Sequence, residues 1–94
     1  MSDIQETLET RENHYGNFMG TATAAQDIKA VIVKHSNTVG TPIKQLDADM
    51  QESLSMIATK IGRIITGDPW YSDSWIDIAG YATLVADRLQ KEGF

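Results

Sequence analysis

Two long runs with helical spacing of apolar residues, separated by a short stop signal, constrain this fold more than any other feature. In the first run, about residues 46–65, the apolar positions on one helix face are Leu54, Ile57, Ile61, Ile64 and Ile65. Gly67-Asp68-Pro69 then ends the helix, and the second run covers about residues 72–91. A connection this short predicts that the two helices pack antiparallel, as a long C-terminal hairpin.

The second run is apolar over more than one face. Its apolar positions are Ile76, Ile78, Ala79, Ala82, Leu84, Val85, Ala86 and Leu89. A surface helix normally has a single apolar stripe, so this breadth predicts burial against the hairpin partner and against another surface, such as a second subunit.

The N-terminal half predicts two more helices. The first begins near Ser2 and ends before Gly16, and a glycine-containing corner at 14–20 follows it. The second covers about 21–34, and 36–41 forms a polar linker. No segment shows a convincing strand pattern. The chain is therefore expected to be a single all-α domain over 1–94, a small bundle of about four helices.

Chain length and composition favour self-association. A chain of 94 residues buries only about 60–65% of its unfolded surface, and small domains usually need a further source of stability. The absence of cysteine removes disulfides and thiolate zinc sites. Only His14 and His35 remain as imidazole ligands, and nothing pairs them, so no metal site is predicted. A homo-oligomer is the expected solution.

Charge and hydropathy exclude several classes of partner. No apolar run is long enough for a membrane span, and the acidic N-terminus does not resemble a signal peptide. A cytoplasmic protein without a membrane partner is expected. The net charge of -5 argues against binding a DNA or RNA polymer, although a few local cations can still hold a small anion.

A hairpin folded about Pro69 predicts which charged residues face one another. Level positions are Lys60 with Asp77 or Ile78, Arg63 with Asp73 or Trp75, and Glu52 with Arg88. These pairs have two interpretations that can both hold. Either they are ion pairs that fix the hairpin register, or Lys60 and Arg63 present charge to a phosphate while Asp73 and Asp77 orient them or hold a cation.

Several aromatic residues lie near glycine-rich corners, where a nucleobase could stack on them with about 1–3 kcal/mol. They are Tyr15, Phe18, Trp70, Tyr71, Trp75 and Tyr81. Core or subunit packing is the ordinary role of each, and Trp75 is the expected core residue. Tyr15, Trp70 and Tyr81 are the predicted ligand contacts. Gly62 and Gly80, inside helices, predict close approach of a neighbouring helix, or at Gly80 of a ligand.

Three stretches together resemble a family of short phage and prophage proteins without an established function. They read Arg11…His14-Tyr15-Gly16-Asn17-Phe18, Met56-Ile57-Ala58-Thr59-Lys60-Ile61-Gly62-Arg63-Ile64, and Gly67-Asp68-Pro69…Asp73-Ser74-Trp75-Ile76-Asp77-Ile78-Ala79-Gly80-Tyr81-Ala82. The resemblance covers nearly the whole chain, and the Asp-Ser-Trp-x-Asp-Ile-Ala-Gly-Tyr run is specific to the short family. That family is distantly similar to MazG-like all-α nucleotide pyrophosphohydrolases, which implies a MazG-like fold, a nucleotide-type ligand and a place in the host cytoplasm.

The acidic residues depart from the MazG-like pattern. Those enzymes use Glu-Glu-x-x-Glu on one helix and Glu-x-x-Asp on the next to hold Mg²⁺ against a triphosphate, as suits a hard cation. Here Lys60 and Arg63 occupy the first motif, and Asp73-x-x-x-Asp77 matches the second only approximately. No catalytic residue is therefore assigned, and Mg²⁺ is a cofactor only under a hydrolase hypothesis.

Three functional hypotheses remain. The leading one is a phage accessory protein that sequesters a phosphorylated nucleotide-derived ligand at a subunit interface without turnover, with a possible role against host defence. The second is a Mg²⁺-dependent MazG-like pyrophosphohydrolase with an altered metal site. The third is a structural or host-protein-binding module, in which the four charged residues of the hairpin only staple it.

Overall fold

Four α-helices account for most of the chain: α1 (Ser2–Tyr15), α2 (Phe18–Val39), α3 (Ala48–Thr66) and α4 (Ser72–Lys91). The structure, a computed structural model, describes the backbone of residues 2–94 and the side chains of residues 4–10 and 16–94. A short 3-10 helix, η1 (Ile43–Gln45), connects α2 to α3. Residues 2–94 contain no β-strand, which confirms the all-α class with about four helices. None of the described helices has the length and apolarity needed to cross a membrane.

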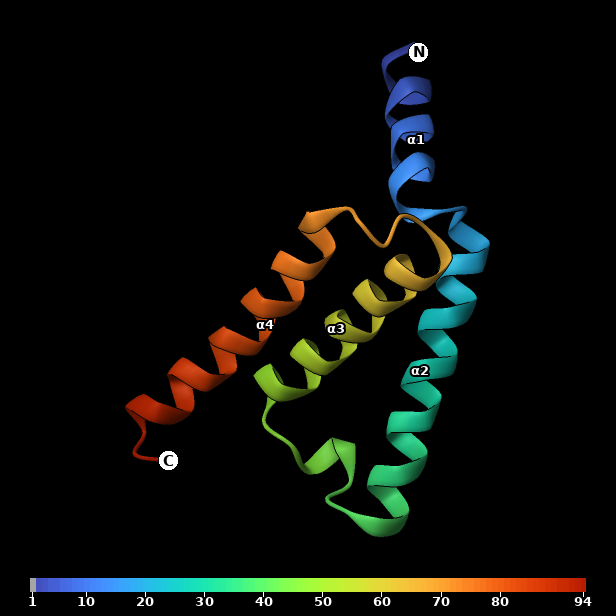
Figure 1. Cartoon of the computed structure of the whole chain (residues 1–94). Coiled ribbons are helices and arrows are strands. Elements are labelled where there is room, and N and C mark those ends of the chain that lie inside the picture. The colour runs from blue at the N-terminus through green and yellow to red at the C-terminus, as the bar shows by residue number, and fades with distance from the viewer. Residues whose placement is uncertain (1) are drawn as a thin grey trace.

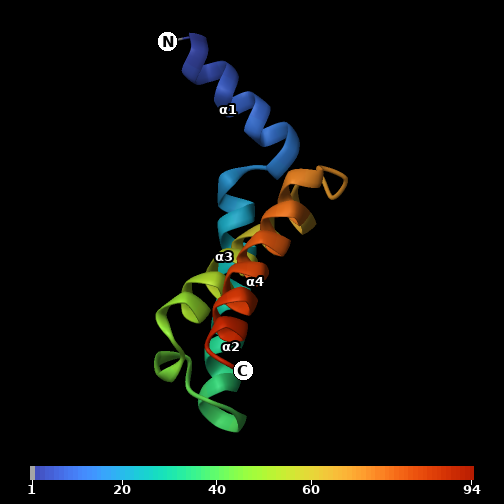
Figure 2. The same cartoon turned by 90° about the vertical axis from the view of Figure 1, so that its left-hand side faces the viewer.

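Helix α3 lies between α2 and α4 and packs against both, so these three helices form an open layer (Figure 1). α3 and α4 run antiparallel, which confirms the C-terminal hairpin. α1 projects away from the layer and touches it mainly near its C-terminal end (Figure 2). The molecule is elongated, with extents of 49, 30 and 25 Å. The expected small bundle is therefore a layer with two open faces.

Helix α2 begins three residues earlier than its apolar spacing predicts. The side chain of Asn17 accepts a hydrogen bond of 2.7 Å from the backbone N–H of Gly20 and caps the helix. The predicted corner at 14–20 is confined to Gly16 and Asn17, because residues 14–15 belong to α1 and residues 18–20 to α2. The chain bends between α1 and α2 at Gly16, whose φ of 74° favours glycine (Figure 1).

Helix α2 also ends later than predicted, at Val39. The hydroxyls of Ser36 and Thr38 donate to backbone carbonyls of the preceding turn, at 2.9 and 3.0 Å. These polar side chains therefore stay within the helix, and the predicted linker at 36–41 is wrong except for its last two residues. Pro42 directly precedes η1.

Small residues bring α2 and α3 into close contact. A Cβ added to Gly62 would lie 3.0 Å from the carbonyl oxygen of Thr21 and 3.3 Å from the backbone nitrogen of Ala25. The hydroxyl oxygens of Thr21 and Thr66 are 2.9 Å apart across the same interface. Close helix approach at Gly62 is thus confirmed. At Gly80 a Cβ would meet no atom of the described residues within 4 Å, so none of the described helices approaches there.

The apolar core of a single chain is thin. Among the described residues the buried apolar side chains are Ala25, Ala58 and Ile64. Trp75, the expected core residue, is 54% exposed, and its indole N–H donates to the carbonyl oxygen of Pro69 at 2.9 Å. The prediction for Trp75 is therefore wrong, because this side chain closes the turn before α4 and does not enter the interior.

Candidate functional site

An ion pair joins α3 to α4 near the middle of the hairpin. The ammonium nitrogen of Lys60 lies 2.8 Å from a carboxylate oxygen of Asp77, and the Lys60 side chain is only 10% exposed. The predicted register is confirmed at this position. Because the Lys60 ammonium pairs with a carboxylate on α4, its charge is neutralised within the hairpin, on the side of α3 that faces away from α2.

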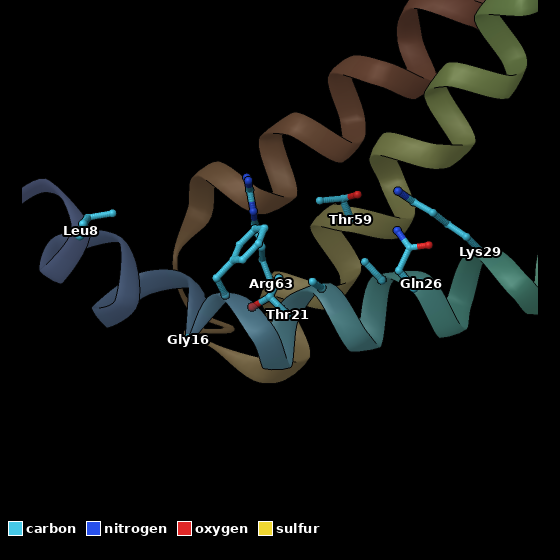
Figure 3. Close-up of a pocket in the computed structure, with 10 residues that line it drawn as sticks. Leu8, Gly16, Thr21, Gln26, Lys29, Thr59 and Arg63 are labelled. Carbon is cyan, nitrogen blue, oxygen red and sulfur yellow. The ribbon is translucent and has the colours of Figure 1, made fainter. Parts of the chain in front are cut away.

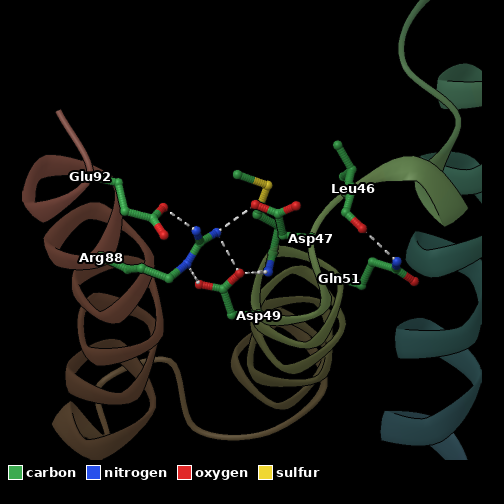
Figure 4. Close-up of polar contacts among 7 residues, drawn as sticks. Leu46, Asp47, Asp49, Gln51, Arg88 and Glu92 are labelled. Carbon is green, nitrogen blue, oxygen red and sulfur yellow. Dashed lines mark hydrogen bonds and ion pairs between the residues drawn. The ribbon is translucent and has the colours of Figure 1, made fainter. Parts of the chain in front are cut away.

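A second charged cluster closes the other end of the hairpin (Figure 4). The guanidinium of Arg88 bonds Asp47 at 2.8 Å, Asp49 at 2.7 Å and Glu92 at 2.7 Å. Hydrogen bonds from Arg88 lower the pKa of Asp49, and the carboxylates raise the pKa of Arg88 above its ordinary value. The predicted partner, Glu52, is exposed instead. These contacts fix the end of α4 against the start of α3.

Arg63, one turn beyond Lys60, lines a cleft of about 440 Å³ between the α1–α2 corner and α3 (Figure 3). The described lining residues are Leu8, Gly16, Phe18, Thr21, Ala22, Ala25, Gln26, Lys29, Thr59 and Arg63. Its volume falls within the range of about 300–1,000 Å³ that is usual for small-molecule sites. The cleft is therefore the candidate functional site.

Two helices supply the polar side chains of the cleft. Gln26 and Lys29 are three residues apart on α2 and share a face, while Thr59 and Arg63 are four apart on α3. Figure 3 shows these side chains extending towards the same side of α2. The close packing at Gly62 sets the spacing between the two helices, so the backbone contact determines where Lys29 lies relative to Arg63.

The cleft combines cationic, polar and apolar surfaces. Arg63 and Lys29 offer N–H donors and positive charge, and Gln26 and Thr59 can complete hydrogen bonds. Phe18, which is 85% exposed, provides an aromatic face at the α1–α2 corner, and Leu8 lines the edge from α1. A ligand with an anionic group and a flat ring would match this arrangement.

The structure separates the residues that the sequence groups together. Of the predicted site residues with described side chains, Arg63 alone lines the cleft. Asp73 is exposed in the first turn of α4, Trp70 is 88% exposed in the α3–α4 turn, and Tyr81 lies half-buried on α4. The side chain of Tyr15, like that of His14, lies outside the described residues.

Lys29, Gln26 and Thr59 are among the cleft residues that the sequence did not predict as site residues. The sequence feature that could have pointed to them is Gly62. It predicts a close contact with another helix but does not identify that helix. Among the described residues no group of three or more histidine or acidic side chains could hold a metal ion.

Comparison with known proteins adds no assignment. No family model, curated protein or solved structure matches the chain. The similarity to short phage proteins and to MazG-like enzymes stays a prediction, and function is argued from the cleft.

Proposed function

We propose that the chain binds a phosphorylated nucleotide-type ligand in the α2–α3 cleft and holds it without turnover. The observation that carries this proposal is the convergence of Arg63 and Lys29, from two helices, on one cleft beside the exposed ring of Phe18. A guanidinium offers forked donors to phosphate oxygens, and an ammonium adds a point charge. The ring can stack with a base.

Binding without hydrolysis is favoured by the chemistry of the lining. None of the described lining residues carries a carboxylate, whereas Mg²⁺-assisted phosphoryl chemistry relies on oxygen ligands of that kind. Asp73 and Asp77 belong to α4, on the other side of α3. The resemblance to phage proteins adds a biological setting to the proposal, in which capture of a host nucleotide signal would counter a defence response. Participation of a second subunit in the cleft stays a prediction.

Calorimetric titration of the full chain with AMP, ADP, ATP and cyclic di-AMP tests the proposal. Arg63→Ala and Lys29→Ala should each weaken binding by about 1.5–3 kcal/mol, the usual scale for hydrogen bonds to charged groups. Lys34→Ala is the matched control, since Lys34 is exposed on α2 and outside the cleft.

Two results would contradict the proposal. One is the absence of binding by every compound in the panel. The other is a loss of thermal stability in Arg63→Ala with unchanged affinity of the folded protein, which would favour the structural-module hypothesis. Release of pyrophosphate or phosphate only when Mg²⁺ is present would support the hydrolase alternative.

A further inference from the structure

The outward face of α4 carries an apolar stripe that none of the residues described by the structure covers. Ile76, Ala79, Gly80, Thr83 and Leu84 follow one another at the spacing of a single helix face and line a shallow groove. Ile76 and Leu84 are 62% and 67% exposed. The opposite side of α4 packs on α3, where Ser74 is buried and the carbonyl oxygen of Tyr81 accepts a hydrogen bond from the hydroxyl of Ser53. Ile78 and Val85, on that side, are partly buried, so α4 carries apolar residues on two opposite sides.

Gly80 lies in the middle of this outward stripe. Glycine is among the least favourable residues in a helix interior, and at Gly62 the close approach of α2 accounts for it. At Gly80 no atom of the described part of the chain lies within 4 Å of an added Cβ. A helix that crosses α4 at Gly80 from outside could approach as closely as α2 approaches Gly62.

The chain also exposes more surface area than a compact protein of its mass. A compact protein of 10.4 kDa exposes about 5,400 Å², whereas this chain exposes 6685 Å². The excess, about 1,300 Å², is larger than the roughly 800 Å² that each partner buries in a standard protein interface. This excess belongs to the whole elongated chain, including the projecting α1 (Figure 2), so it is compatible with an interface of standard size but does not place that interface on α4.

We propose that a second copy of the chain covers this face, with the two α4 helices crossing antiparallel at Gly80. Ile76 precedes Gly80 by four residues and Leu84 follows it by four, so the stripe is close to self-complementary about its centre. A two-fold axis through the crossing places Ile76 of each copy opposite Leu84 of the other. The small side chains of Ala79 and Thr83 let the helices approach closely.

The assembly is independent of the ligand proposal, because the cleft lies on the α2 side of α3 and the stripe lies on the far side of α4. Charge opposes the assembly, since each copy carries a net charge of -5 and the exposed carboxylates of Asp73 and Asp87 lie on α4. Asp77 also lines the groove, and Asp73 and Asp87 lie seven residues before and after Gly80, on the same helix face. Added salt should therefore strengthen the dimer by screening the repulsion between copies.

Analytical ultracentrifugation of the full chain over a range of micromolar concentrations tests the proposal. The wild type should sediment as a dimer, and Gly80→Gln should raise the dimer dissociation constant by at least about thirtyfold. Circular dichroism should show unchanged helix content, since glutamine is a better helix former than glycine. Leu84→Lys should also raise the dimer dissociation constant, because it places a charged side chain in the apolar stripe. Gly40→Gln is the matched control, because a Cβ at Gly40 also meets no atom within 4 Å.

Cross-linking provides a positive test that does not depend on weakened association. The chain has no cysteine, so Gly80→Cys introduces a single thiol. A disulfide needs Cα atoms about 4.4–6.8 Å apart, which two helices crossing at residue 80 provide. Gly80→Cys should form a covalent dimer faster than Gly40→Cys does. A monomeric wild type, equal association of wild type and Gly80→Gln, or equal cross-linking of the two cysteine variants would each overturn the proposal.

Discussion

The ammonium of Lys60 and the carboxylate of Asp77 lie 2.8 Å apart, with the lysine buried and the aspartate half-exposed. Arg63, three residues further along α3, lines the cleft beside α2. Lys60 and Arg63, which look equivalent in the sequence, therefore lie on different sides of α3. One pairs with Asp77 in the hairpin, and the other lines the candidate site.

Removing the carboxylate of this pair should destabilise the protein. Asp77→Asn leaves the buried ammonium of Lys60 without its counter-charge, and an unsatisfied buried polar group costs about 1–3 kcal/mol. We expect a loss of that size in the free energy of unfolding, measured by urea denaturation. Asp73→Asn is the control, since Asp73 is exposed on the same helix and should change stability by less than about 0.5 kcal/mol. Equal effects of the two substitutions would contradict a structural role for the pair.

The Arg88 cluster should make stability depend on pH in the acidic range. Hydrogen bonds from Arg88 lower the pKa of Asp49 in the folded protein, whereas an unfolded aspartate has a pKa of about 3.9. The ionised carboxylate thus stabilises the fold above about pH 4, and this contribution is lost as the pH falls through the lowered pKa. Thermal melting between about pH 5 and pH 3 should show a shallower decline for Asp49→Asn than for wild type. Asp87→Asn, an exposed carboxylate of α4, should retain the wild-type slope.

Gly16 should tolerate substitution far less than Gly93, although both have positive φ values of 74° and 92°. An alanine Cβ at position 16 would overlap the carbonyl oxygen of Thr66, whereas at position 93 it would meet nothing. We expect Gly93→Ala to cost about 1 kcal/mol and Gly16→Ala about 3 kcal/mol or more, by thermal or chemical unfolding. Similar losses would show that the α1–α2 corner does not press against the end of α3.

Hydrolysis of common nucleoside triphosphates should be slow or absent. Lys60 and Arg63 occupy the stretch where a MazG-like enzyme would place carboxylates, and the described cleft lining has none. Incubation with each triphosphate, with and without Mg²⁺, followed by pyrophosphate detection, should show no more release than buffer. Strong Mg²⁺-dependent release that disappears in Asp73→Asn or Asp77→Asn would establish the enzyme instead.

The C-terminal hairpin could be predicted because its signals are local. The apolar spacing of residues 46–65, the Gly67-Asp68-Pro69 stop and the level positions of Lys60 and Asp77 all come from neighbouring parts of the sequence. The predicted boundaries of α2 were wrong because the local signals at both of its ends are ambiguous. Asn17 and the hydroxyls of Ser36 and Thr38 are typical of both loops and helix ends, and their hydrogen bonds decide between the two.

The cleft could not be predicted, since it depends on which helix packs against α3. Lys29 and Arg63 line the same cleft because Ala25 and Thr21 pack on Gly62. Contacts between such small residues produce little periodic pattern in the sequence. Trp75 shows a second limit. An aromatic residue predicts buried area, but its indole N–H also needs an acceptor, and the carbonyl of Pro69 provides one at the surface.

The order in which the helices pack also affects how fast the chain can fold. α2 packs on α3 and α3 packs on α4, so each main interface joins segments that are consecutive in the chain. Proteins dominated by such local contacts reach the native state in microseconds to milliseconds, because only short loops must close before packing begins. Closing the hairpin between α3 and α4 requires ordering only the short loop of residues 67–71.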